Sequence, residues 1–318
     1  MSYTKDQANE LLPMKPTEAI TDPRRLKYLI IGPPKWGKTT FLCAVPDSIL
    51  LATEEGHAFH KTYKIIIDSW DKQTIKERAD SWGVDDDKNT HTTMVEAVDA
   101  ICASDKFQFV IIDTADMAAK MCLDFHYQKF GVNHASDAGD YGKGWDISLT
   151  QPFRQVIGQL MKSGRGIGFI THTQVIEKRI GASVMSRAET TLPSQVQKFL
   201  HTQADLIIHG RFGKKRPGMP ERDRIISLDG TNEILAGSRV RHITLPKKFI
   251  VDPDKPWEQW KGFFEDEELS QKADQQYIDL VLHGKEAEEV AAEPETATIS
   301  ATEPPDKPAV SKKATKRN

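Results

Sequence analysis

Residues 32–40 have the sequence Gly-Pro-Pro-Lys-Trp-Gly-Lys-Thr-Thr, which fully matches the pattern G-x-x-x-x-G-K-[ST]. Glycines in such a loop let backbone N–H groups approach phosphate oxygens, and the lysine ammonium can bridge the β- and γ-phosphates. The hydroxyl that follows the lysine is suited to ligate Mg²⁺. The pattern therefore predicts a site for ATP and Mg²⁺. The predicted nucleotide-binding residues of the loop are Gly32, Pro33, Pro34, Lys35, Trp36, Gly37, Lys38, Thr39 and Thr40. Lys35 and Trp36 occupy variable positions of the pattern and are assigned no chemistry.

A carboxylate at the end of an apolar run is the expected partner of this loop. Residues 107–112 are apolar apart from Gln108, and Asp113 follows them directly. An acidic residue at the end of a buried strand holds the Mg²⁺ shell in P-loop enzymes. We therefore predict that Thr39 and Asp113 hold the metal.

Hydrolysis also needs a group that positions or deprotonates the attacking water. The run Ser48 to Ala52 ends two residues before Glu54, and neighbouring parallel strands end at the same sheet edge, so Glu54 is the predicted catalytic carboxylate. The alternative is a solvated Glu54–Glu55 pair. A further apolar run leads into Thr-His-Thr-Gln, where His172 or Gln174 could sense the γ-phosphate or merely cap the strand.

Two polar stretches have the composition of nucleic-acid-binding loops. Residues 133–145 are Gly-rich and contain Tyr141, Lys143 and Trp145, which suits base stacking and phosphate contact. Alternatively, Trp145 begins the next helix and packs inward. Residues 177–187 contain Lys178, Arg179 and Arg187 beside a single acid, so they could contact phosphates or form an ordinary basic surface loop.

The elements that must position these residues alternate between strands and helices, which predicts an α/β fold with a mainly parallel sheet. We expect strands at residues 27–31, 48–52, 107–112, 167–171 and 206–210, and core-facing helices at 93–103 and 149–162. Two later strands, at 224–228 and 240–245, are predicted to extend the sheet edge in antiparallel fashion.

The chain divides into four predicted segments. Residues 1–23 form an N-terminal arm, 24–251 the ATPase core, and 252–284 a short helical segment whose aromatic residues pack on that core. Residues 285–318 contain no aromatic residue and are rich in Glu, Ala, Thr and Pro, so they are predicted to be a disordered tail.

Composition excludes several classes of protein. The net charge of −3 is incompatible with a uniformly basic nucleic-acid coat, so any such site must be local. The three cysteines are isolated in sequence, which predicts neither a disulfide framework nor a zinc site. No apolar run approaches the roughly 20 residues that span a bilayer. We expect a soluble, unsecreted cytoplasmic protein without membrane contact.

The order of these motifs resembles the RecA superfamily over residues 27–246. The segments on which the resemblance rests are GPPKWGKTT, ATEEG, FQFVIIDT and GFITHTQ followed by IEKRIG. AAA+ proteins usually place a glutamate directly after the strand-ending aspartate, whereas Thr114 follows Asp113 here. The likeness is greatest to the core-only RecA-like single-strand annealing proteins of bacteriophages (the Sak group). This chain departs from the superfamily at the sensor position, where residues 171–173 are Thr-His-Thr and the superfamily usually has Asn-Gln.

The resemblance implies a RecA-like core and an ATPase that binds single-stranded DNA and promotes strand annealing and recombination. It also implies a homo-oligomer, either ring or filament, the host cytoplasm as location, and a single-strand DNA-binding protein as a possible partner. Glu54 matches the catalytic glutamate and His172 the sensor, and disordered DNA-contacting loops should follow Asp113 and Thr171. Arg239 and Arg241 resemble a cation pair, two residues apart on a strand, that reaches the γ-phosphate of a neighbouring subunit; exposed edge arginines are the alternative.

Two other functions share the phosphate-binding residues. A RecA-like motor, such as a helicase or packaging ATPase, would normally carry a further DNA-engaging domain. An NTP-driven switch would bind no DNA. The ATPase response to single-stranded DNA separates these alternatives.

Overall fold

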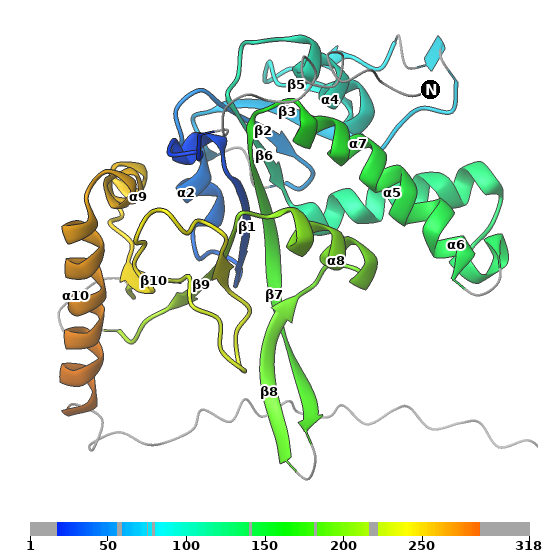
Figure 1. Ribbon diagram of the computed structural model, residues 1–318. Coiled ribbons are helices and arrows are strands. Elements are labelled where there is room, and N and C mark those ends of the chain that lie inside the picture. Colours follow the sequence, from blue (N-terminus) through cyan, green and yellow to red (C-terminus); the bar gives the residue numbers. More distant parts are fainter. Residues whose placement is uncertain are drawn as a thin grey trace, which may run out of the picture.

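A mostly parallel β-sheet runs through the computed structural model, with helices on both of its faces (Figure 1). The structure describes residues 18–55, 59–74, 76–77, 80–139, 142–180, 183–215 and 222–286. Within these residues the sheet has the strand order β12-β10-β9-β1-β7-β6-β2-β3-β5-β4, with β11 paired to β9 and β8 paired to β7. The predicted α/β fold, mainly parallel with an antiparallel edge, is confirmed.

The parallel strands form the centre of the sheet. They are β1 (Lys27–Gly32), β2 (Ser48–Ala52), β3 (Tyr63–Ser69), β5 (Thr90–Thr93), β6 (Phe109–Asp113), β7 (Gly166–Ile180) and β9 (Leu206–Phe212). The antiparallel additions are β4 (Gly83–Val84), β8 (Ser183–Thr190), β10 (Arg224–Ser227), β11 (Gly237–Ser238) and β12 (Lys248–Ile250).

Helices connect these strands and cover the sheet. They are α2 (Lys38–Cys43), α4 (Met94–Ala103), α5 (Ala115–Phe130), α6 (Lys143–Trp145), α7 (Gln151–Lys162), α8 (Ser194–Gln203), α9 (Pro256–Glu265) and α10 (Glu267–Glu286). Short helical turns lie at η1 (Pro23–Arg25), η3 (Ala135–Ala138) and the π-helical η4 (Asp146–Thr150). Thr93 and Thr114 cap α4 and α5 with their side chains, as threonine does at many helix starts.

The central strands are buried on both faces, which explains why their sequences are continuous apolar runs. Leu29 and Ile31 of β1 face a core that includes side chains of α4, α5, α7 and α8. Tyr28 and Ile30 face a second core on the opposite side, with α2 and α9. There the Trp260 indole donates a hydrogen bond to the Tyr28 hydroxyl at 3.2 Å, which ties α9 to the central strand.

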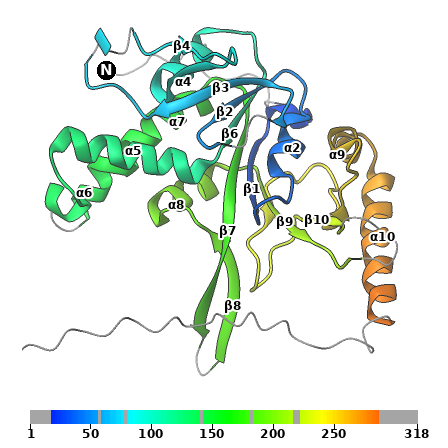
Figure 2. The same cartoon turned by 180° about the vertical axis from the view of Figure 1, so that it is seen from behind.

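Two strand predictions need correction. Residues 240–245 do not form a strand; Pro246 lacks a backbone donor, and the place beside β10 is taken by β12. The strand predicted at 167–171 continues to Ile180 and pairs with β8, so residues 177–180 and 183–187 belong to the two strands of a β-hairpin and not to a loop. Figure 2 shows this hairpin extending away from the body of the sheet. Strands β3 and β5 were not predicted, because β3 is flanked by polar residues and β5, Thr-His-Thr-Thr, contains no apolar residue.

Among the described helices, none is both long and apolar enough to cross a lipid bilayer.

The stability of this fold should fall in mild acid because of His209 on β9. Its side chain is 4% exposed, and burial, helped by Arg211, lowers the pKa of His209 to about 4. An unfolded histidine has a pKa near 6.5. Between pH 6.5 and 4 the unfolded chain therefore binds a proton at His209 that the native state does not bind. The free energy of unfolding, which has its full value above pH 6.5, falls as the pH drops toward 4. His209→Gln should reduce this loss, measured by urea unfolding at several pH values.

His91→Gln is the matched control, because hydrogen bonds that the His91 ring donates to Asp68 and Asp85 raise the pKa of His91 and reverse the sign. An unchanged pH dependence in His209→Gln would contradict the assignment.

Candidate nucleotide-binding site

The loop at residues 32–39 connects the end of β1 to the start of α2. Gly37 has a φ of 99°, a left-handed conformation that favours glycine. Lys38 is 6% exposed, and its Nζ donates to the carbonyl oxygens of Gly32 at 2.8 Å and Pro33 at 3.0 Å. Burial lowers the pKa of Lys38, while the nearby carboxylates oppose that change. The ammonium is thus held against the loop, where a phosphate would replace carbonyl contacts by a stronger opposite charge.

Thr39 and Asp113 meet across two elements, as predicted. The Thr39 hydroxyl donates to Oδ2 of Asp113 at 2.7 Å. Burial raises the pKa of Asp113, and the hydrogen bond from Thr39 opposes that rise. A partly dehydrated carboxylate beside a hydroxyl is a donor set that suits a hard cation such as Mg²⁺.

Glu54 is brought to this edge by the pairing of β2 with β6, in which Ala52 lies opposite Asp113. The Thr53 hydroxyl accepts the Thr114 N–H at 2.8 Å and donates to the Thr114 carbonyl at 3.0 Å, which locks the two strand ends together. The Thr114 hydroxyl in turn donates to Oε1 of Glu54 at 2.6 Å. Glu54 is therefore oriented by a neighbouring threonine.

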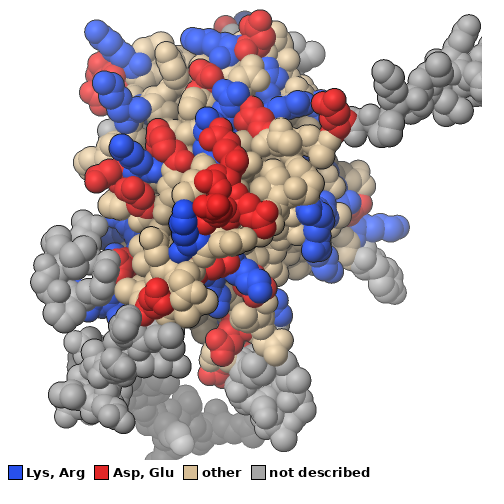
Figure 3. Space-filling view, turned by 60° about the vertical axis from the view of Figure 1, so that its left-hand side comes forward, with Lys and Arg blue, Asp and Glu red and all other residues tan. Residues whose placement is uncertain are grey.

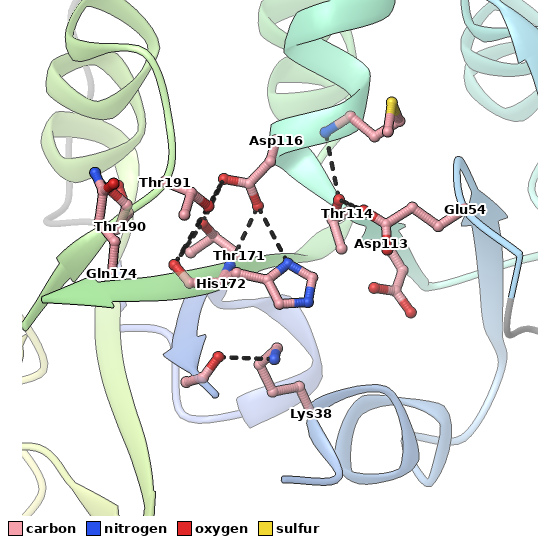
Figure 4. Close-up of polar contacts among 12 residues, drawn as sticks. Lys38, Glu54, Asp113, Thr114, Asp116, Thr171, His172, Gln174, Thr190 and Thr191 are labelled. Carbon is pink, nitrogen blue, oxygen red and sulfur yellow. Dashed lines mark hydrogen bonds and ion pairs between the residues drawn. The ribbon is translucent and has the colours of Figure 1, made fainter. Parts of the chain in front are cut away.

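His172 and Gln174 diverge at the end of the sheet (Figure 4). His172 lies opposite Gly32 in the pairing of β1 with β7 and lines the cleft. The Gln174 amide instead donates to the Thr190 carbonyl at 2.8 Å, within the hairpin. Of the two predicted sensors, only His172 faces the phosphate loop.

These groups line a cleft of 490 Å³. The cleft is also lined by Glu55, Phe59, His60 and Arg224, none of which was predicted to contact nucleotide. Arg224 begins β10 and packs so closely on Gly37 that a Cβ there would lie 2.8 Å from its Nη1. No local motif marks Arg224, because only the antiparallel pairing of β10 with β9 brings it to the loop.

Trp36 supports the loop from beneath. It is 1% exposed, and its indole N–H donates to the Arg211 carbonyl at 2.8 Å. A Cβ at Gly210 would lie 2.8 Å from the Trp36 ring, so this glycine makes room for the tryptophan. This variable position of the motif thus anchors the phosphate loop to β9.

The first predicted DNA-binding stretch is partly helical. Lys143 and Trp145 form α6, which continues through η4 into α7, and Tyr141 lies outside the described residues. Trp145 is the last residue of α6 and is 38% exposed, so the alternative that it begins a helix and packs inward is wrong.

The second stretch lies on the hairpin. Residues 178 and 179 belong to β7, and Arg187 on β8 has its Nε 3.6 Å from Oε1 of Glu189. The expectation of a disordered loop is therefore wrong at this position.

Arg239 and Arg241 are not part of the cleft in their own chain. They follow β11, whose Ser238 pairs with Leu206 at the amino end of β9, opposite to the phosphate loop. The Arg239 N–H donates to the Asp205 carbonyl at 2.8 Å. The expected alternation on one strand is wrong, because residues 239–245 form no strand; a contact with a neighbouring subunit stays a prediction.

Comparison with protein families agrees with this geometry. Residues 24–240 match the family model described as an AAA domain. The chain belongs to this family. None of the curated proteins matches it significantly. Membership establishes a nucleotide-binding, P-loop ATPase-type domain. The RecA-like assignment, and with it the predicted separation from AAA+ proteins, is not part of what the match shows and stays a prediction.

The residues of this AAA domain fit ATP and Mg²⁺. Lys38 would neutralise phosphate oxygens, and Thr39 and Asp113 would hold the metal, which screens phosphate charge when bound. The described part of the chain contains no cluster of three or more His, Cys, Asp or Glu residues arranged for a metal. Glu54 would accept a proton from water, with the Thr114 hydroxyl fixing its carboxylate.

Glu54→Gln should bind ATP normally but hydrolyse it about 100-fold more slowly, because the shape is kept while proton acceptance is lost. Glu55→Gln is the matched control, since Glu55 lines the same cleft. Single-turnover hydrolysis and equilibrium ATP binding measure the two effects. A defect confined to Glu55→Gln would move the catalytic role by one residue.

Arg224→Gln should lower the ATPase kcat by about tenfold or more, because it removes a guanidinium beside the phosphate loop. Since Arg224 and Lys38 line the same cleft of one chain, mixing Arg224→Gln with Lys38→Ala should restore no activity. Mixing Arg239→Ala with Lys38→Ala is the comparison, because a trans-acting arginine would be rescued in mixed assemblies. Full activity of Arg224→Gln, or its rescue by Lys38→Ala, would contradict a cis role.

Proposed function

We propose that this AAA-domain protein is an ATPase that binds single-stranded DNA and promotes strand annealing during homologous recombination. The observation that carries the proposal is the continuity of β7. Its residue His172 lines the nucleotide cleft, and the same strand then runs on into the hairpin. A DNA-contacting arm would thereby be joined directly to the hydrolytic site.

The hairpin has the form of an arm. Beyond the sheet, β7 and β8 pair from Thr173 opposite Thr190 to Ile180 opposite Ser183. Figures 1 and 2 show the two strands projecting from the body of the molecule. Its sequence supplies the cations Lys178, Arg179 and Arg187, which suit backbone phosphates. A projecting two-stranded ribbon of this kind can bind along the DNA backbone without contacts to the bases.

Trp145 offers a second type of contact. Its ring is 38% exposed on α6, next to Lys143. Gly144 between them leaves no room for a Cβ, which would lie 1.5 Å from the Ala135 carbonyl oxygen, so α6 is held tightly against η3. A rigidly placed aromatic ring supports base stacking, which contributes about 1–3 kcal/mol per base.

The surface supports a local and not a general DNA site. Lys and Arg side chains alternate with Asp and Glu on the face drawn in Figure 3, and the net charge is −3. A continuous basic surface is absent from the described residues on that face. This face would therefore not act as a general DNA-binding surface.

The remaining parts of the proposal follow from the RecA-like resemblance. They are a homo-oligomer, as ring or filament, in which Arg239 and Arg241 reach a neighbouring nucleotide, and a single-strand DNA-binding protein as partner. The cytoplasm, of the host in the case of a bacteriophage protein, would be the site of action.

Single-stranded DNA should stimulate the ATPase, and its affinity should fall with salt at a log–log slope of about −0.7 per phosphate contacted. Lys178→Ala and Arg179→Ala should make that slope shallower, whereas Trp145→Ala should weaken binding at an unchanged slope, because stacking releases no counterions. The measurements are ATP turnover with and without an oligonucleotide, and fluorescence titrations at several salt concentrations.

Lys272→Ala is the matched control, because Lys272 lies on α10 and pairs with Glu268. No effect of DNA on turnover would favour an NTP-driven switch, and processive duplex unwinding would favour a motor. Unchanged binding in all three site variants would remove the hairpin and α6 from the proposal.

A further inference from the structure

The Asp116 carboxylate lies between the nucleotide cleft and the base of the hairpin (Figure 4). Its Oδ1 accepts hydrogen bonds from the hydroxyls of Thr171, at 2.9 Å, and Thr191, at 2.5 Å. Its Oδ2 accepts the His172 N–H at 3.2 Å and lies 3.9 Å from Nδ1 of the same residue. One side chain of α5 therefore contacts residues before and after the hairpin.

These contacts lie where β7 leaves the parallel sheet. His172 is the last residue of β7 that pairs with β1. The next residue, Thr173, is the first that pairs with β8, opposite Thr190. The Thr191 N–H donates to the His172 carbonyl at 3.1 Å. The residue that faces the cleft thus also closes the base of the hairpin.

The first turn of α5 connects this junction to the catalytic edge. Thr114 caps the helix and donates to Glu54, and Asp116 lies two residues further along in the same turn. A helical turn transmits a displacement at one of these residues to the other, because its backbone hydrogen bonds fix their relative positions. The cleft and the hairpin base are therefore joined through the first turn of α5, which bonds to Glu54 at Thr114 and to the hairpin base at Asp116.

A purely structural account explains only part of this arrangement. A carboxylate in the first turn of a helix stabilises that helix through its dipole, with or without tertiary contacts. The dipole does not require bonds to two separate segments on either side of a hairpin. Thr191 is itself exposed, so its hydroxyl could be satisfied by water without the Asp116 contact.

We propose that Asp116 is a positioning residue that couples the occupant of the nucleotide cleft to the orientation of the β7–β8 hairpin. When a triphosphate displaces His172, the hydrogen bonds that Asp116 accepts from His172 and Thr191 change. The base of the hairpin then shifts with the nucleotide. This inference rests on the proposed function in so far as the cleft binds ATP, but it does not require that the hairpin bind DNA.

The test compares Thr191→Val, which deletes the donor, with Thr191→Ser, which keeps it. Hydrogen–deuterium exchange of residues 173–190 is followed in the full chain with and without a non-hydrolysable ATP analogue and Mg²⁺. We expect the analogue to change exchange in the wild type and in Thr191→Ser by about fivefold or more, as for other coupled sites. Thr191→Val should lose this response while its affinity for the analogue stays within about twofold of wild type.

A second variant guards against a trivial loss of structure. Asp116→Ala should also lose the response, and the double variant with Thr191→Val should be no worse than either single one, because both remove the same interaction. An equal response in Thr191→Val and wild type, a wild type without any response, or loss of the response in Thr191→Ser would overturn the coupling. The proposed function fails by a different result: the protein would bind nucleotide, but single-stranded DNA would not change its ATP turnover.

Discussion

The parallel pairing of β2, β6, β7 and β1 is the constraint on which the rest of the structure depends. Its register places Ala52 opposite Asp113 and His172 opposite Gly32, so the ends of β1, β2 and β6 meet His172 of β7 at one edge. The Thr53–Thr114 hydrogen bonds fix the last step of that register. Because side chains alternate along a strand, a slip of one residue would turn these groups to the opposite face and dismantle the site.

Burial gives the polar groups at this edge their electrostatic character. Lys38 and Asp113 are both shielded from water. Burial lowers the pKa of Lys38 and raises that of Asp113, so in each case it favours the neutral form. Each charge is offset by specific partners, which are loop carbonyls for the lysine and the Thr39 hydroxyl for the aspartate. Dehydrated charges interact strongly with a ligand of opposite sign. The same core packing that stabilises the fold therefore strengthens the attraction between the cleft and a metal–phosphate group.

The sheet also joins the cleft to more distant parts of the molecule. On one side, Trp36 fastens the phosphate loop to β9, whose neighbour β10 carries Arg224. On the other side, β7 continues without a break into the hairpin, and Asp116 bonds to both ends of it. The phosphate loop is thus supported by a buried tryptophan, while the hairpin is held near its base by the side chain of Asp116 and by backbone hydrogen bonds, including one from the Ala188 N–H to the Glu233 carbonyl.

The sequence by itself determined the phosphate loop, the Asp113 strand end, Glu54 and the α/β fold, because each depends on local spacing or on apolar runs that only a buried strand explains. Tertiary structure alone decided what long-range pairing brings together. Arg224 and Asp116 contact the site through residues far away in the chain, and neither has a local motif. Residues 177–187 have a polar composition typical of a loop, yet cross-strand pairing places 177–180 and 183–187 in a hairpin. Residues 240–245 have the composition of a strand, but the sheet edge was already occupied by β12. Local patterns specify which conformation a segment favours, whereas the partner that satisfies its backbone and side chains is set by the whole fold.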